Sequence, residues 1–147
     1  MIDNTEIKRL RVSNELFFEI ILKELNVGKT VKFNVTGNSM LPFLRNGDQV
    51  IIKRPVMSEI GIGSIVLASY QEKIILHRVV KIKNDIYYLA GDGNLDQVEE
   101  VNVRDLLAYV LKGMRGYKEL NLNTIFSKKL GIIWYHIRPL RYLFNKF

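Results

Sequence analysis

Hydrophobic positions repeat along this chain with two different periods, which predict helices at both ends and strands between them. Near the N-terminus the apolar residues recur at four-residue steps, as one face of a helix requires: Phe17, Ile21 and Leu25. The pattern predicts a helix over residues 14–26. Ser13 precedes the helix in the position of an N-cap, and Gly28 follows it as a C-terminal stop.

From Val31 onward the hydrophobic period becomes strand-like. Six short runs rich in β-branched and aromatic residues are separated by polar turn residues: VKFNV, QVIIKR, SIVLASY, KIILHRVVKIK, DIYYLA and LLAYVLKGM. Such a series predicts a mainly β, β-rich α+β fold built as a compact antiparallel domain. Between Asp96 and Asp105 the pattern is weak, and we expect a loop or a helical turn there.

The last stretch, SKKLGIIWYHIRPLRYLFNKF, returns to helical spacing. Pro139 should kink or interrupt this helix near Arg138. Two interpretations of its amphipathic pattern are equally open. The helix either docks on the β domain with its basic residues in water, or it lies in a membrane interface with its apolar face in lipid.

Composition bounds the architecture and excludes some chemistry. A chain of 147 residues with 25% charged and 48% hydrophobic residues is long enough for one globular domain with a core. We divide it into an N-terminal helical segment (1–30), a β domain (31–117) and a basic, aromatic C-terminal tail (118–147) that we expect to be helical. No cysteine is present and only two histidines occur, so we expect no disulfide, no metal site and no cofactor.

Charge and hydropathy indicate where the protein acts. No run of eighteen apolar residues occurs, and the N-terminus lacks the basic start and apolar run of a signal peptide, so we expect a cytoplasmic protein. The net charge is +7, and no acidic residue follows Asn121. An anionic membrane surface is therefore a candidate partner of the tail. No recognition-helix pattern accompanies the charge, which argues against nucleic acid.

The candidate chemistry begins with the stretch GNSMLPFLRNGD, which presents Ser39 between two turn signals. A nucleophilic serine needs a base and a group that orients the base. His77 is the candidate base, and Asp92 and Asp96 in AGDGNLDQ are the candidate acids. Taken singly, each residue has a simpler explanation: a serine and aspartates that form turns, and a histidine in a core. Periodicity and spacing alone leave that choice open.

Three stretches, taken in order, resemble one enzyme superfamily. GNSMLPFLRNGDQVII looks like the nucleophile box shared by signal peptidase I and the self-cleaving SOS-response repressors. GSIVLASYQEKIILHRVVKI resembles the next two strands of that superfamily, in which the general base directly precedes Arg-Val, and LAGDGNLD is similar to its Gly-Asp-Asn box. The resemblance covers about half of the chain and implies the signal-peptidase-like β fold.

The resemblance also implies residue roles. It makes Ser39 the nucleophile and His77 the base, in the place where bacterial signal peptidases carry lysine. Histidine there resembles the endoplasmic-reticulum and archaeal subtype. Lys73 lies four residues away on the same predicted strand, roughly 13 Å, too far to replace it. The acid is Asp92 or, a little early for the family pattern, Asp96.

The remaining residues of the nucleophile box would bind substrate. The resemblance implies an oxyanion hole that uses the Ser39 backbone N–H and a neighbour in the loop. Gly37 would allow a substrate backbone to approach closely, beside Asn38, Met40 and Pro42.

The implied activity is that of a serine endopeptidase that cleaves a leader or signal-like segment of a peptide or protein precursor. The substrate would lie extended against an edge strand, with small residues before the scissile bond. The alternative is a non-catalytic or regulatory relative that keeps the fold for binding or membrane attachment. We favour the enzyme, because a binding relic has no need of both Ser39 and His77.

Overall fold

The computed structural model describes residues 14–145, and residues 1–13, with the predicted cap Ser13, lie outside the described residues. The first helix, α2, spans Asn14–Asn26, as the apolar spacing predicted. Ile21 and Leu25 of its apolar stripe are almost fully buried. Gly28 ends the helix in the left-handed region, with φ of 84°, and donates its N–H to the Leu25 carbonyl.

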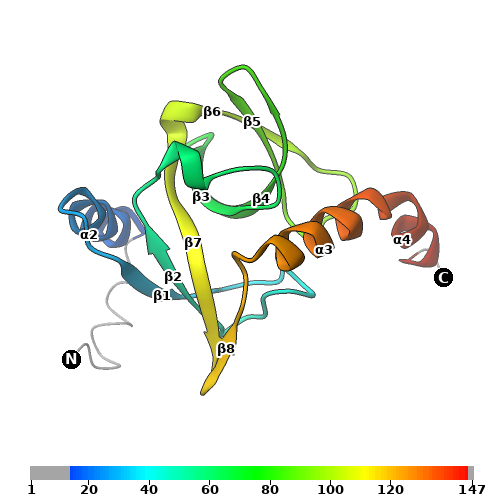
Figure 1. The fold of residues 1–147 in the computed structure, drawn as a ribbon, viewed down its shortest axis with the longest axis horizontal. Coiled ribbons are helices and arrows are strands. Elements are labelled where there is room, and N and C mark those ends of the chain that lie inside the picture. The colour runs from blue at the N-terminus through cyan, green and yellow to red at the C-terminus, as the bar shows by residue number, and fades with distance from the viewer. Residues whose placement is uncertain (1–13, 146–147) are drawn as a thin grey trace.

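An eight-stranded antiparallel sheet that curls on itself forms the body of the protein (Figure 1). Its strands are β1 (Val31–Asn34), β2 (Gln49–Lys53), β3 (Ile65–Tyr70), β4 (Lys73–Lys83), β5 (Ile86–Ala90), β6 (Glu99–Asn102), β7 (Leu106–Arg115) and β8 (Lys118–Leu120). The order across the sheet is β1-β2-β7-β3-β4-β5-β6, and β8 pairs with β7. The predicted mainly β fold with helices at both ends is confirmed.

The weak pattern between Asp96 and Asp105 conceals a strand. The structure places β6 there, followed by the short 3-10 helix η2 (Val103–Asp105), so the expected helical turn is present but follows a strand. Glu99 and Val101 of β6 are buried and alternate with more exposed neighbours. A glutamate in an inward position breaks the apolar alternation on which the prediction of strands depends.

The core consists of two clusters on the two faces of the sheet. In β3, Ile65 and Leu67 join the cluster that packs against α2, whereas Val66 and Ala68 join the cluster on the opposite face. Successive side chains of a strand point to opposite faces, so a strand covered on both sides reads as a continuous apolar run.

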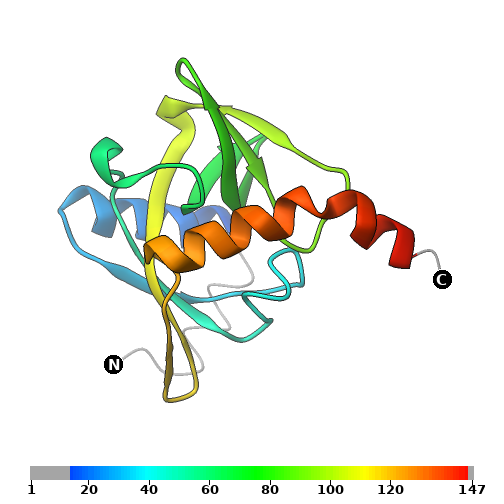
Figure 2. The ribbon, with the colours of Figure 1, turned by 45° about the vertical axis from the view of Figure 1, so that its right-hand side comes forward.

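Two helices lie at the C-terminal end, on the far side of the molecule from α2, and the last of them projects beyond the sheet (Figures 1 and 2). They are α3 (Ile125–His136), capped by Thr124, and α4 (Arg138–Asn145). The chain breaks at Ile137 because Pro139 cannot continue the hydrogen-bonding of α3 but fits the first turn of a new helix, as predicted. None of the helices in residues 14–145 is long and apolar enough to cross a membrane.

A buried ion pair joins α3 to the sheet. Arg78 of β4, 1% exposed, donates through Nε and Nη2 to the two carboxylate oxygens of Asp92, at 2.8 and 2.7 Å. Its Nη1 donates to the Gly63 carbonyl at 2.8 Å. A Cβ at Gly131 of α3 would overlap the Arg78 guanidinium. The docked interpretation of the tail therefore holds for this side of α3.

A second ion pair closes the long loop between β1 and β2. Asp48, 3% exposed, accepts hydrogen bonds from Arg115 Nε at 3.0 Å, Arg115 Nη2 at 2.8 Å and the Arg45 N–H at 2.8 Å. The hydrogen bond from Arg115 holds the pKa of Asp48 below its ordinary value of 3.8. The loop that carries Ser39 is thus fastened at its C-terminal end to β7.

We predict that Gly131→Ala destabilises the protein, although alanine is the better helix former by about 1 kcal/mol. The new methyl would displace Arg78 from its three hydrogen bonds, and overpacking of this kind costs about 1–3 kcal/mol. Thermal or urea unfolding measures the difference. Gly61→Ala is the control, because a Cβ there meets nothing within 4 Å. Equal stability of the two variants would show that α3 is not clamped on Arg78.

We predict that Asp48→Asn lowers the free energy of unfolding at neutral pH by about 2 kcal/mol, since it removes a charged acceptor of buried hydrogen bonds. The folded pKa of Asp48 lies below the unfolded one. Its contribution is therefore complete above about pH 4 and is lost as the pH falls through the folded pKa. Urea unfolding across this range should show wild type and variant converging in acid. The exposed carboxylate variant Asp85→Asn should not differ from wild type at either pH.

Candidate functional site

Ser39 is presented by the loop between β1 and β2. Gly37 has φ of 86°, a conformation that favours glycine, and donates its N–H to Asn46 Oδ1 at 2.9 Å. Ser39 is exposed, whereas Met40 beside it is 2% exposed and fixes the loop in the core. The local sequence thus turns the chain sharply, inserts one apolar side chain and leaves the serine at the surface.

His77 is buried in β4 and held by a carboxylate that the sequence pattern did not reveal. His77 Nδ1 lies 2.6 Å from Glu99 Oε1, and the two residues are 7% and 6% exposed. A carboxylate on Nδ1 fixes the ring orientation and the tautomer with hydrogen on Nδ1. The free Nε2 is then an acceptor that can take a proton.

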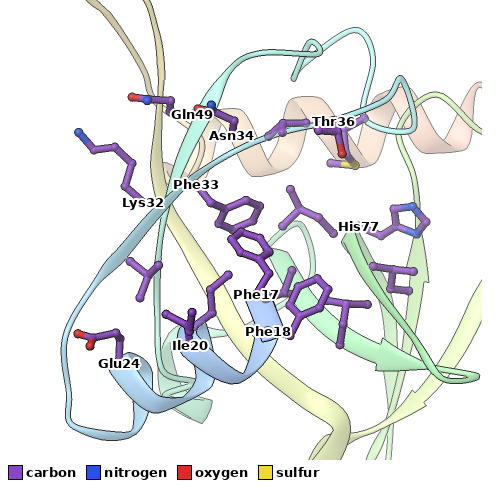
Figure 3. A pocket seen from close by; sticks show the side chains of 18 of the residues that line it. Phe17, Phe18, Ile20, Glu24, Lys32, Phe33, Asn34, Thr36, Gln49 and His77 are labelled. Carbon is purple, nitrogen blue, oxygen red and sulfur yellow. The ribbon is translucent and has the colours of Figure 1, made fainter. Parts of the chain in front are cut away.

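One cavity of about 1090 Å³ is lined by both Ser39 and His77. It extends from the nucleophile loop between β1 and the first half of β4 to α2 (Figure 3). Phe17, Phe18 and Phe33 gather within it, so its wall away from the serine is apolar. A large cavity with an apolar wall and a few polar groups at one end has the form of a substrate site.

Two glycines bring the loop after β5 against the nucleophile loop. A Cβ at Gly91 would lie 2.6 Å from the Ser39 carbonyl oxygen and 3.0 Å from His77 Nε2, so both atoms are within 3.0 Å of one point. A Cβ at Gly93 would lie 2.7 Å from the Asn38 carbonyl oxygen, and the Gly93 N–H donates to the Ser39 carbonyl at 2.9 Å. The two glycines of the Gly-Asp-Gly stretch therefore allow this loop to approach the backbone of the nucleophile loop closely, in addition to forming a turn.

Within residues 14–145 no hydrogen bond joins Ser39 Oγ to His77 Nε2. The two groups share the cavity wall without a hydrogen bond between their side chains, and hydrogen bonds of catalytic groups are often long before substrate binds.

The structure places neither of the predicted aspartates, Asp92 and Asp96, in a hydrogen bond with His77. Glu99 forms the hydrogen bond with His77 Nδ1, and the Asp92 carboxylate accepts hydrogen bonds from Arg78. Asp96 is exposed. Sequence spacing favoured the aspartates because they directly follow the strand β5. Glu99 reaches the histidine because β6 folds back antiparallel on β5, with Glu99 opposite Leu89.

Asp92 has a structural position at the centre of the site. Burial raises the pKa of its carboxyl, and the hydrogen bonds from Arg78 act against that shift. Its carbonyl oxygen accepts from Trp134 Nε1 at 2.8 Å and from Arg141 Nη2 at 2.6 Å. Its N–H points to the sulfur of Met40 at 3.5 Å. The C-terminal helices thus hold the loop that in turn supports Ser39, a role that helical periodicity could not indicate.

Of the other predicted substrate-binding residues, one lines the cavity and two lie in the exposed part of the nucleophile loop. Met40 lines the cavity together with Ser39. Asn38 and Pro42 are exposed in the same loop, where the Asn38 carbonyl accepts from the Leu41 N–H at 3.2 Å and Pro42 follows a cis peptide bond. In the described part of the chain the backbone N–H groups of Ser39 and Met40 donate to no other residue, so either can face a developing oxyanion.

Two strand edges border the cavity and are open among the described residues. β1 pairs only with β2, and residues 73–77 of β4 pair only with β3, because pairing with β5 begins at Arg78. Both segments contribute residues to the cavity lining. Unpaired N–H and C=O groups on such edges are ready to bind an extended peptide by strand addition.

No group of three or more His, Asp or Glu side chains that could hold a metal ion occurs in residues 14–145. The arrangement offers a hydroxyl, an imidazole, a carboxylate and free backbone N–H groups beside an apolar cavity.

Comparison with known proteins agrees with this arrangement at the level of family. No curated protein sequence matches the chain. The family model described as Peptidase S24-like matches residues 3–105, which include the nucleophile loop, β4 and β6. With well over half of its length matched and its antiparallel curled sheet carrying Ser39 and His77, the chain belongs to the Peptidase S24-like family.

Proposed function

We propose that this protein is a serine endopeptidase in which Ser39, His77 and Glu99 act together. The observation that carries the proposal is the buried contact of 2.6 Å between His77 Nδ1 and Glu99 Oε1, on the wall of the cavity that Ser39 also lines. A buried histidine whose Nδ1 is held by a carboxylate is prepared to accept a proton at Nε2. A histidine that only filled a core would have no use for an open cavity on its other side.

The proposed reaction begins with attack of Ser39 Oγ on the scissile carbonyl carbon as His77 Nε2 takes the hydroxyl proton. The negative charge on the carbonyl oxygen is stabilised by the backbone N–H groups of Ser39 and Met40. His77 then gives its proton to the leaving amine nitrogen, and the acyl-enzyme forms. Water then gives a proton to His77 Nε2 and attacks the acyl carbon. The bond between that carbon and Ser39 Oγ breaks, and His77 returns the proton to Oγ as the acid product leaves. Glu99 holds the imidazole ring in place through Nδ1.

The proposed substrate is a leader or signal-like segment of a precursor, bound in extended form. The open edges of β1 and of residues 73–77 in β4 can receive its backbone on either side. The wall formed by Phe17, Phe18 and Phe33 favours apolar side chains along the segment. We propose that small residues precede the scissile bond, where the loops that carry Ser39 and Gly91 approach each other.

Because the proposed base is His77, the proposal places the protein in the subtype of signal-peptidase-like enzymes that uses histidine in place of lysine. Lys73, the nearest lysine on the same strand, is exposed and four residues from His77, about 13 Å along a strand. It cannot reach a proton on Ser39.

A non-catalytic role is the second candidate. It is favoured by the missing hydrogen bond between Ser39 Oγ and His77 Nε2 within the described residues. In that case the open strand edges bind a peptide without cleaving it.

We predict that a fluorophosphonate probe labels Ser39 and that Ser39→Ala abolishes labelling while the protein stays folded. Only a hydroxyl with a base beside it reacts quickly with such a probe. Mass spectrometry of the digested protein locates the adduct. Ser58→Ala is the matched control, since Ser58 is also exposed. Labelling of Ser58 at the same rate as Ser39, or of neither, would support the non-catalytic role.

We predict that His77→Ala and Glu99→Gln each slow the labelling of Ser39 by about 10²–10⁴-fold, because the base is lost or wrongly oriented. The controls are Asp96→Asn, an exposed carboxylate, and Lys73→Ala, an exposed lysine, and both should label like wild type. A loss in Asp96→Asn equal to that in Glu99→Gln would return the orienting role to Asp96. A loss in Lys73→Ala would make lysine the base.

A further inference from the structure

The helices α3 and α4 present two different faces. The face toward the sheet carries Gly131, Trp134, Arg138 and Arg141, which contact Arg78, the Asp92 carbonyl and the Gln97 carbonyl. The opposite part of both helices is largely exposed. It carries seven large apolar side chains that are 43–76% exposed, the outer ridge: Ile125, Phe126, Leu130, Ile133, Leu140, Leu143 and Phe144.

The outer ridge has one exposed apolar row on each helix. Phe126, Leu130 and Ile133 of α3 recur at steps of four and three residues, and Leu140 and Phe144 of α4 are four residues apart, so within each helix they share one face. The row on α3 extends over seven residues, about 10 Å along a helix. Scattered exposed apolar residues are normal on a protein, but two such rows on consecutive helices mark an interaction surface.

The charges beside the outer ridge identify its partner. No acidic residue occurs from Asn121 to Phe147, and Lys129 and His136 are exposed on the same helix. Arg138 and Arg141 point inward and leave the ridge apolar. A second copy of the chain would bring its own net charge of +7 against this one. An anionic lipid surface attracts the same charge and accepts the apolar side chains.

We propose that the outer ridge binds an anionic membrane surface, with α3 and α4 lying in the plane of the interface. Helices of 12 and 8 residues are too short to span a bilayer, so the mode is peripheral. The ridge inserts among the acyl chains, and Lys129 stays at the level of the headgroups. The other face of α3 remains on the sheet, so the folded domain is carried to the membrane as a unit. Membrane attachment does not depend on the proposed peptidase activity.

The test is sedimentation of the purified full-length protein with large vesicles. Vesicles of equal parts phosphatidylserine and phosphatidylcholine should bind the protein, vesicles of phosphatidylcholine alone should bind it weakly, and salt should release it from the first. The double variant Ile133→Ser, Phe144→Ser should bind the anionic vesicles at least about tenfold more weakly, since two apolar side chains no longer leave water. Val27→Ser, Val56→Ser is the control, with exposed valines elsewhere on the protein, and should bind like wild type.

Two further measurements distinguish a lipid partner from a second copy of the chain. Lys129→Glu should weaken binding to the anionic vesicles by about tenfold, because it removes one attraction to the lipid headgroups and adds one repulsion. Lys53→Glu, an equal change at another exposed lysine, should have little effect. Absence of vesicle binding, or equal loss in the valine control, would overturn the proposal. So would sedimentation equilibrium that shows a dimer dissociated by Ile133→Ser, Phe144→Ser, because the ridge would then be a contact between two copies.

Discussion

The buried ion pair between Arg78 and Asp92 is the contact on which the rest of the site depends. Arg78 is among the largest fully buried side chains, and its hydrogen bonds go to Asp92 and to the Gly63 carbonyl, which lie on segments other than β4. A buried arginine that lost its carboxylate would cost about 3–5 kcal/mol, because its charge would remain without compensation. The pair therefore fixes the loop after β5, which supports Ser39 through the Gly93 N–H.

Neighbouring residues of β4 divide two tasks. His77 contacts Glu99 and the cavity, while Arg78 contacts Asp92 and lies under Gly131 of α3. Side chains alternate along a strand, so one strand can carry the proposed base on one face and the clamp on the other. The alternation explains why His77 and Arg78 can be adjacent in the His-Arg-Val stretch and still contact different partners. It also explains why two acids near each other in sequence, Asp92 and Glu99, meet different partners.

The C-terminal helices are part of the site and also face outward. Through Trp134 and Arg141 they hold the carbonyl of Asp92, and through Gly131 they make room for Arg78. The two interpretations of the tail left open by its sequence are thus not exclusive. An amphipathic pattern states that a helix has an apolar side, but it does not state whether that side meets a core or another surface. Here a basic and aromatic side docks, and much of the apolar side stays exposed.

The sequence by itself determined the mainly β fold, six of its strands, α2 and the break at Pro139, because these follow from local periodicity, from runs of β-branched and aromatic residues and from backbone chemistry. It also pointed to Ser39 and His77 as the candidate pair. Only the tertiary structure decided that Glu99 meets His77, since this contact depends on β6 folding back on β5 and joins residues 22 positions apart. The same holds for Asp92, whose partner Arg78 and helix contacts are set by packing of distant segments. Spacing along a chain shows only which residues are near in sequence. A buried carboxylate pairs with the charged or hydrogen-bonding group that packing places beside it, and that group can come from a distant segment.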